Sequence, residues 1–303
     1  MEHSLLTKLT ILIFSYNRQE YLTRTIKYWL NYNVNLVILD GSKVKLNDPC
    51  LSSKKIKYIH NINGLYDRFL SSQELIDTEF MMLGSDDEFY LPSAVSSCIK
   101  FLMEEPTYYS CGGRALAFGH DGKKYYGFEP YPKLKDLCLD SNDFIERIFK
   151  HFSVYVPAHV YSVMRTSNWN IICSNIFKKK YNFDSSEELQ IEFLVMVSGK
   201  SKIIPQLMWM RNREVPSVNE KNPQFRLSFI KEWWFDKNYV NEKIDFLNTM
   251  KKACDKILNN KSLEITPEKI SMLFELFISR PVFKKNPLKR IVNFFQIQKK
   301  KNN

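Results

Sequence analysis

Apolar runs that alternate with amphipathic segments are the feature of this sequence that most constrains its fold. Residues 9–15 and 34–40 are runs of mostly aliphatic residues, as expected of strands that are buried on both faces. The segment between them, residues 18–32, places six side chains on one helical face: Tyr21, Leu22, Thr25, Ile26, Trp29 and Leu30. This alternation predicts right-handed crossovers and therefore an α/β fold, a mostly parallel sheet with helices on both faces.

The alternation continues up to residue 105. Two shorter strands are expected at residues 56–60 and 79–83. Helices are expected at residues 64–76 and 92–105, and the second begins with a proline, which is well tolerated at a first helical position. The first third of the chain therefore predicts a repeated strand–helix order.

The second half of the chain is less regular. Strand-like runs surround glycine turns between residues 108 and 131, and further strands are expected at 158–166 and 201–211. A helix is expected at 185–200, with serine at its N-cap and glycine at its end. From about residue 216 the sequence changes to long helical stretches rich in Lys and Asn. We therefore expect a domain of residues 1–215, followed by a helical C-terminal region of residues 216–303.

Composition limits the function classes. The 303 residues are 44% hydrophobic and 25% charged, as in a globular protein with a sizeable core. The net charge of +11 favours an anionic partner, namely nucleic acid, an anionic membrane surface or a phosphorylated substrate.

Cysteine usage and hydropathy point to the cytoplasm. The six cysteines form no C-x-x-C pair and have no histidine nearby, which argues against a cysteine zinc site or a disulfide framework. No apolar run approaches the ~20 residues that cross a bilayer. The N-terminal apolar run is interrupted by Lys8 and lacks a cleavage site, so it is interpreted as a strand and not as a signal peptide.

Polar residues directly follow three of the predicted strands. They are the segments "SYNR" (15–18), "DGS" (40–42) and "SDD" (85–87). Ligands of open α/β sheets bind beyond the carboxyl ends of the strands, so the three segments are expected to meet at one edge of the sheet. This edge is the predicted binding site.

The acidic triplet Asp86, Asp87 and Glu88 has two interpretations. It is either a solvated turn that caps the helix beginning near Pro92, or a cation site. No glycine-rich phosphate-binding motif follows the first strand, so a bound nucleotide needs another source of positive charge. Asp86 and Asp87 can hold Mg²⁺ or Mn²⁺, and such an ion stabilises a nucleoside diphosphate as it leaves.

Four segments together resemble the GT-A-fold glycosyltransferases, in particular the family-2-like group and its bacterial members that build surface polysaccharides. They are "ILIFSYNRQEYLTRTI", "VILDGS", "NGLYDRF" and "EFMMLGSDDEFYLP", within residues 9–92. The resemblance continues at residues 185–211. It implies a transferase that uses a nucleotide-sugar donor, most simply of UDP type, with Mn²⁺ or Mg²⁺ as cofactor.

The resemblance also implies roles for particular residues. It implies that Asp40 contacts the nucleoside of the donor and that Arg68 contacts the diphosphate. The other donor-binding residues that it implies are Ser15, Tyr16, Asn17, Arg18, Asp86 and Asp87. Each of these also has an ordinary structural explanation, such as a helix cap, a turn or a solvated helix charge.

The metal-binding D-x-D pattern of the family is matched imperfectly. Gly84 stands where the family has its first aspartate. In that register Asp86 is the metal ligand, and in a shifted register Asp86 and Glu88 form the pair.

The acceptor side of the family matches residues near 187. Glu187 and Glu188 begin a predicted helix, and the resemblance assigns Glu188 as the catalytic base, which takes the proton of an attacking hydroxyl. The alternative is a favourable acidic first turn. His159 is a further candidate for acceptor binding. The Q-x-x-R-W signature of processive members is absent, which favours transfer of a single sugar.

Residues 281–303 carry seven Lys and Arg and no acidic residue, interleaved with apolar side chains. Such a tail is typical of a segment that lies on an anionic membrane surface, and it suits a lipid-linked glycan acceptor and a peripheral position on the inner face of the cell membrane. A solvated basic terminus is the alternative.

Three rival functions remain: a retaining transferase of the same fold, a sugar nucleotidyltransferase, and a nucleic-acid binder. The last is disfavoured, because it does not explain acidic residues at strand ends.

Overall fold

A mixed sheet of ten strands forms the centre of the computed structural model, which describes residues 2–120, 122–156, 159–183, 186–213, 230–259 and 265–278. Within these residues the strand order is β3-β2-β1-β4-β9-β6-β10-β5, with β7 paired to β6 and β8 paired to β10. The predicted α/β class is confirmed.

The first four strands pair in parallel, as the alternating pattern predicts. They are β1 (Leu9–Ser15), β2 (Asn35–Asp40), β3 (Ile56–His60) and β4 (Phe80–Ser85). The helices between and after them are α1 (Gln19–Trp29), α2 (Leu65–Ser71) and α3 (Pro92–Glu104). A 3-10 turn at Ser72–Leu75 continues α2, so this helix ends earlier than the sequence suggests.

Two long strands carry the second half of the sheet, β6 (Tyr108–His120) and β10 (Lys200–Asn212), and they pair in parallel. The short strand β9 (Val163–Arg165) pairs antiparallel with both β4 and β6, and so joins the two halves. Three small strands complete the sheet: β5 (Phe89–Tyr90), β7 (Tyr125–Phe128) and β8 (Cys138–Leu139).

The strand predicted at residues 158–166 is only partly present. His159–Tyr161 form a 3-10 turn, and the strand is confined to β9. One reason is visible at Val160, whose backbone N–H donates to the side chain of Glu192 at 2.9 Å and not to a neighbouring strand.

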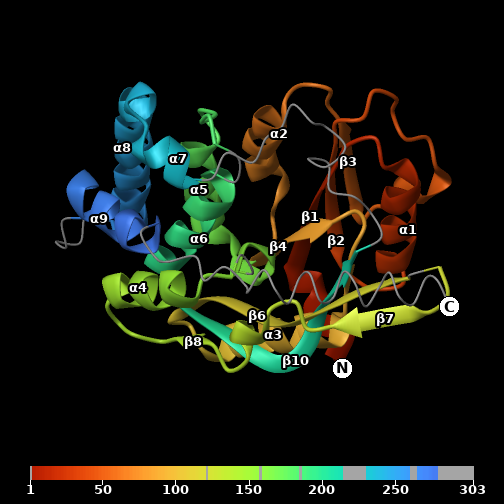
Figure 1. Ribbon diagram of the computed structural model, residues 1–303. Coiled ribbons are helices and arrows are strands. Elements are labelled where there is room, and N and C mark those ends of the chain that lie inside the picture. Colours follow the sequence, from red (N-terminus) through yellow and green to blue (C-terminus); the bar gives the residue numbers. More distant parts are fainter. Residues whose placement is uncertain are drawn as a thin grey trace, which may run out of the picture.

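The remaining helices pack together beside the sheet, on the left of Figure 1. They are α4 (Phe144–Val154), α5 (Thr166–Ile176), α6 (Ser186–Ser198), α7 (Ile230–Phe235), α8 (Val240–Ile257) and α9 (Pro267–Ile278). Helices α4 and α5 are not foreseen in the sequence analysis. The proposed domain boundary near residue 216 lies outside the described residues, so the division into two domains stays a prediction.

Strand side chains alternate between two hydrophobic cores, one on each face of the sheet. Ile11 and Ile13 of β1 face the core that contains α1 and α3, whereas Leu12 faces the core that contains α5 and α6. Helix α6 is buried all round from Leu189 to Val197, which is why its apolar residues show no single stripe. The helices of the N-terminal half and α6 are therefore fixed against the same sheet.

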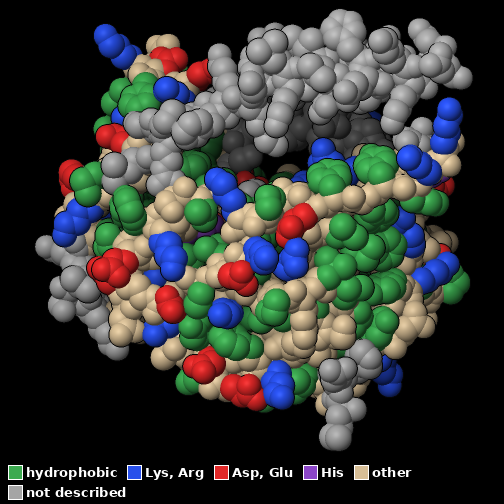
Figure 2. Space-filling view, turned by 60° about the horizontal axis from the view of Figure 1, so that its bottom comes forward, with side chains coloured by type: hydrophobic (Ala, Val, Ile, Leu, Met, Phe, Trp, Pro, Cys, Tyr) green, Lys and Arg blue, Asp and Glu red, His purple; other side chains and the backbone are tan. Residues whose placement is uncertain are grey.

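The face of the molecule shown in Figure 2 carries its positive charge in a dispersed form. On the face that Figure 2 brings forward, Lys and Arg side chains are scattered among Asp and Glu and do not form one stripe. Among the helices of the described ranges, none combines the length and the apolar character that crossing a bilayer requires. The tail of residues 281–303 lies outside the described residues.

Gly84 lies where a side chain does not fit. It pairs with Ile13 in the register of β1 and β4, and a Cβ atom there would lie 2.7 Å from Cγ2 of Ile11. Packing against the apolar side chains of β1 therefore gives a physical reason for glycine at the position where the family resemblance expects aspartate.

Gly84→Ala is expected to destabilise the protein by ~1–3 kcal/mol, because an extra methyl group in a packed core forces neighbouring side chains to shift. Denaturant unfolding with an unchanged slope measures this loss. Gly127→Ala is the matched control, since its Cβ would meet no atom closer than 3.6 Å. Equal stability of the two variants would show that Ile11 yields easily and that close packing does not demand glycine at position 84.

Candidate functional site

The carboxyl ends of β1, β2 and β4 lie side by side. Ser15 pairs with Asp40, and Phe14 pairs with Ser85, so each strand ends at nearly the same level. The polar residues that follow these strands are thereby brought to one edge of the sheet. We call this edge the rim.

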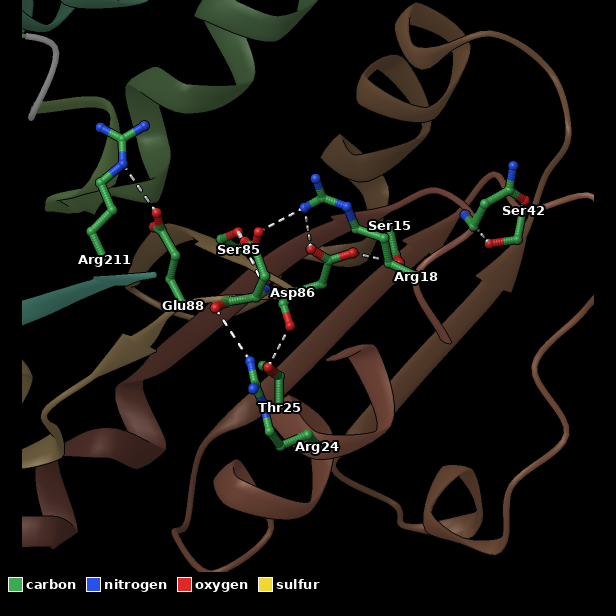
Figure 3. A network of polar contacts seen from close by, with 11 residues as sticks. Ser15, Arg18, Arg24, Thr25, Ser42, Ser85, Asp86, Glu88 and Arg211 are labelled. Carbon is green, nitrogen blue, oxygen red and sulfur yellow. Dashed lines mark hydrogen bonds and ion pairs between the residues drawn. The ribbon is translucent and has the colours of Figure 1, made fainter. Parts of the chain in front are cut away.

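Asp86 and Asp87 at the rim share one arginine. Nη1 of Arg18 donates to Oδ2 of Asp87 at 2.8 Å and lies 3.4 Å from Oδ1 of Asp86, while Ser15 Oγ donates to the other oxygen of Asp86 at 2.8 Å (Figure 3). Burial raises the pKa of Asp86 to about 6, against the hydrogen bond from Ser15. Asp87 also accepts a hydrogen bond from the hydroxyl of Ser85.

Helix α1 fixes the backbone of the acidic turn. Thr25 Oγ1 donates to the carbonyl of Asp86 at 2.8 Å, and Arg24 Nη2 donates to the carbonyl of Asp87 at 3.2 Å. The helical pattern of the sequence places Thr25 on the buried face of α1 but predicts neither contact. These two hydrogen bonds fix the backbone of the turn and thereby the positions of its carboxylates.

Glu88 points the other way, toward β10. Trp209 Nε1 donates to its Oε2, and Arg211 Nε lies 3.3 Å from its Oε1. Burial raises the pKa of Glu88 to about 7, and the bond from Trp209 opposes the rise. The acidic triplet is thus divided between two arginines, as Figure 3 shows.

The positions of Asp86, Asp87 and Glu88 indicate which pair of carboxylates fits a divalent cation. Asp86 and Asp87 converge on one positively charged group, Nη1 of Arg18, so together they offer hard oxygen ligands to one ion. The structure does not bring Glu88 to the same point, because this side chain is held by Trp209 and Arg211. The pair that fits is therefore Asp86 with Asp87, while pairing Asp86 with Glu88 requires a side-chain rotation.

Asp40 and Asn17 hold the loops of the rim together. Asp40 is fully buried and accepts hydrogen bonds from Tyr58 OH at 2.7 Å and from the N–H of Ser42 at 2.8 Å. Asn17 has a positive φ of 54°, a region that asparagine tolerates better than most residues. Its N–H donates to Ser42 Oγ at 2.8 Å, and its Oδ1 accepts from the N–H of Lys43 at 3.1 Å.

Arg68 and Tyr16 lie at the same rim. Nη1 of Arg68 donates to the carbonyls of Asn61 and Asn63, each at 3.3 Å. The guanidinium covers Gly41 so closely that a Cβ atom there would lie 1.4 Å from Nη1. Burial lowers the pKa of Arg68, and the nearby Asp40 opposes this. Tyr16 is 44% exposed, so its ring is available to a ligand.

The second predicted group lies at the start of α6. Oε1 of Glu188 accepts a hydrogen bond from Tyr155 OH at 3.0 Å. Burial raises the pKa of Glu188 to about 7, and the carboxylate of Glu192, one turn along the helix, adds to the rise. Burial also raises the pKa of Glu187. A carboxylate that titrates near neutral pH is well suited to accept a proton.

Arg211 connects the two groups. Its charge lowers the pKa of both Glu88 and Glu188, so it lies near the acidic turn and the start of α6 alike. The rim and α6 therefore face one common region. Arg211, Trp209 and Tyr155 are not foreseen in the sequence analysis; the polar residues at the end of β10 are the signal that could have indicated Arg211.

His159 is fully buried. Its Nδ1 lies 3.2 Å from Oε2 of Glu192, and the ring of His151 lies beside it, with ring centroids 4.7 Å apart. A contact of His159 with an acceptor stays a prediction.

Comparisons with known proteins show the family and the fold of the chain. The sequence pattern described as "Glycosyl transferase family 2" matches residues 10–172. No curated protein matches the chain significantly.

Two crystal structures of TarS from S. aureus share the fold. TarS 1–349 matches with a TM-score of 0.50 and 10% identity, over 82% of this chain and 83% of that one. The same protein in complex with UDP-GlcNAc matches with a TM-score of 0.50 and 12% identity, over 82% of each chain. The fold is therefore of the GT-A type, as the resemblance implies.

Proposed function

Because the chain belongs to glycosyl transferase family 2 and is therefore a glycosyltransferase, we propose that it moves one sugar from a UDP-type donor to a hydroxyl group of a glycan. The observation that carries the proposal is the common region shared by the rim and the start of α6. A nucleotide donor needs polar residues such as those of the rim. An acceptor hydroxyl needs a base such as Glu188 at the start of α6. TarS, whose complex with UDP-GlcNAc has a similar fold, supports a UDP-type donor.

The donor is proposed to bind at the rim. Tyr16 and Asp40 would contact the nucleoside, with Ser15 and Asn17 shaping the loop, and Arg18 and Arg68 would contact the diphosphate. Asp86 and Asp87 would hold Mg²⁺ or Mn²⁺, which supplies positive charge at the leaving diphosphate. Arg18 would then no longer pair with these carboxylates and would be available to the donor. Asp86 with Glu88 is the alternative ligand pair.

Glu188 is proposed as the general base of an inverting transfer. It takes the proton of the acceptor hydroxyl as the oxygen attacks the anomeric carbon, and Tyr155 holds its carboxylate in place. Arg211 keeps a positive charge beside the reacting region. A retaining transfer on the same fold is the second candidate. A sugar nucleotidyltransferase is less well supported, because a basic glycine-rich loop after β1 is missing from the sequence.

The acceptor is proposed to be lipid-linked. The support is the basic, apolar composition of residues 281–303, which would place a cytoplasmic enzyme on the inner face of the membrane.

UDP with Mn²⁺ is expected to stabilise the protein against heat, because a ligand that binds only the folded state adds about 2.7 kcal/mol at one hundred times its Kd. Asp86→Ala should remove the metal-dependent part. A thermal-shift titration with UDP, in Mn²⁺ and in EDTA, measures both effects.

Asp77→Ala is the matched control for this titration. Asp77 precedes β4 at the opposite end of the strand and pairs with Lys57, so its loss should leave the metal effect intact. Equal stabilisation by UDP in Mn²⁺ and in EDTA would contradict the metal assignment, and no stabilisation by any nucleoside diphosphate would contradict donor binding at the rim.

Glu188→Gln is expected to lower turnover by about 10²–10⁴-fold, the usual contribution of a positioned base. The wild-type rate should fall as the pH drops below about 7, because protonation of Glu188 removes the base. The variant should lose this dependence. Steady-state rates with saturating acceptor, across pH, measure both.

Glu187→Gln serves as the internal control, because neighbouring helical residues point about 100° apart. Donor binding, followed by thermal shift, should be unchanged in both variants. If Glu187→Gln is the inactive variant, the base is one residue earlier. If both variants turn over normally, the base lies elsewhere and the retaining mechanism is the better explanation.

Deletion of residues 281–303 is expected to release the protein from anionic liposomes while turnover of a soluble acceptor stays nearly constant. Each Lys or Arg near an anionic surface contributes ~1 kcal/mol, which salt screens. Co-sedimentation at low and high salt measures binding. A variant with the seven Lys and Arg of this tail changed to Gln separates charge from apolar contact. Binding that survives the deletion would show that another surface is the anchor.

A further inference from the structure

Two histidines and a glutamate from three different elements meet in the core. They are His151 of α4, His159 of the 3-10 turn before β9, and Glu192 of α6, and each is 0% exposed. Among the described residues this is the one group in which three such side chains place potential metal-ligand atoms within 4.8 Å of one another. The acidic turn at the rim is not such a group.

The three side chains are close, yet their hydrogen bonds are incomplete. Oε2 of Glu192 lies 2.9 Å from Nε2 of His151 and 3.2 Å from Nδ1 of His159. The contact to His151 has the distance of a hydrogen bond but not its angle, so neither ring nitrogen of His151 has a hydrogen-bond partner, and Nε2 of His159 also lacks one. A buried polar group without a hydrogen-bond partner destabilises the folded protein.

We propose that this group binds one Zn²⁺ ion. Two imidazoles and one carboxylate are a common ligand set for zinc, with a fourth position left for water. With Zn–N bonds of 2.0–2.1 Å, the edges of a tetrahedral site are about 3.3 Å long, close to the two separations observed here. Mg²⁺ prefers oxygen ligands, so this site differs in chemistry from the rim.

The site would hold the start of α6 in place. Glu192 lies one helical turn after Glu188 on the same face of α6. Tyr155, which binds Glu188, directly follows the helix that carries His151. A zinc ion would therefore connect α4, the 3-10 turn and α6 beneath Glu188. The proposal does not depend on sugar transfer, and its test does not measure turnover.

The experiment measures metal content directly. Full-length protein is stripped with a chelator, incubated with a small excess of ZnCl₂, desalted and analysed by inductively coupled plasma mass spectrometry. One zinc per chain is expected for the wild type. Glu192→Gln and His159→Gln should bind zinc at least about 100-fold more weakly, since even indirect partners of zinc ligands contribute 10–100-fold.

Two controls keep the result interpretable. His120→Gln removes an exposed histidine, and Asp86→Ala alters the rim, so both variants should keep one zinc per chain. Co²⁺ substituted into the wild type gives a second measurement that needs no core variant, because a tetrahedral site produces strong visible absorption bands. Absence of stoichiometric zinc from the wild type, or zinc that persists in Glu192→Gln and His159→Gln, would overturn the proposal and leave a hydrogen-bonded core cluster.

Discussion

The parallel pairing of β1 with β2 and β4 is the constraint on which the rest of the site depends. It brings Ser15 level with Asp40 and places the acidic turn one residue beyond Ser85. A shift of one residue would move Ile11 and Ile13 into the opposite core and would separate Ser15 from Asp86. The alternation of apolar residues that drives folding therefore also fixes the register of the strands. This register sets how far Asp86 and Asp87 lie from the loop that carries Arg18.

Burial of helix α6 determines the acid–base properties of Glu188, which lies at its start. Because almost every side chain after its first turn is buried, the helix cannot rotate to expose Glu188 without breaking the core. A carboxylate held in such surroundings keeps its proton to a higher pH than a solvated one, and the carboxylate of Glu192 adds to this effect. The cost of burying acidic groups is thus concentrated at Glu188, the residue proposed as the general base.

Local patterns in the sequence predicted the four parallel strands and the three helices up to residue 105, because the buried strands among them are continuous apolar runs. They missed the two-residue strand β5 and the early end of α2. They also indicated Asp86, which follows a strand, whereas the family resemblance was needed to single out Glu188 at the start of a helix. They could not indicate Tyr155 or His151, whose importance arises from packing α4 on α6, a contact between residues far apart in the chain. Arg211 reaches Glu88 only because β10 pairs with β5. The strand expected at 158–166 was partly wrong because a side chain, that of Glu192, binds the backbone of Val160.

The division of the acidic turn between two arginines explains how a basic chain keeps three adjacent carboxylates in one place. Arg18 pairs with both Asp86 and Asp87, and Arg211 pairs with Glu88, so each carboxylate of the turn has a positively charged partner within the protein. In the proposed mode of binding, Asp86 and Asp87 would hold the divalent cation in place of Arg18, and Arg18 would then be available to the diphosphate of the donor. Exchange of partners at constant local charge costs less than separating charges in a buried site. The arginines of the rim would therefore pair with carboxylates of the protein in the absence of a ligand, and would contact the donor only once it binds.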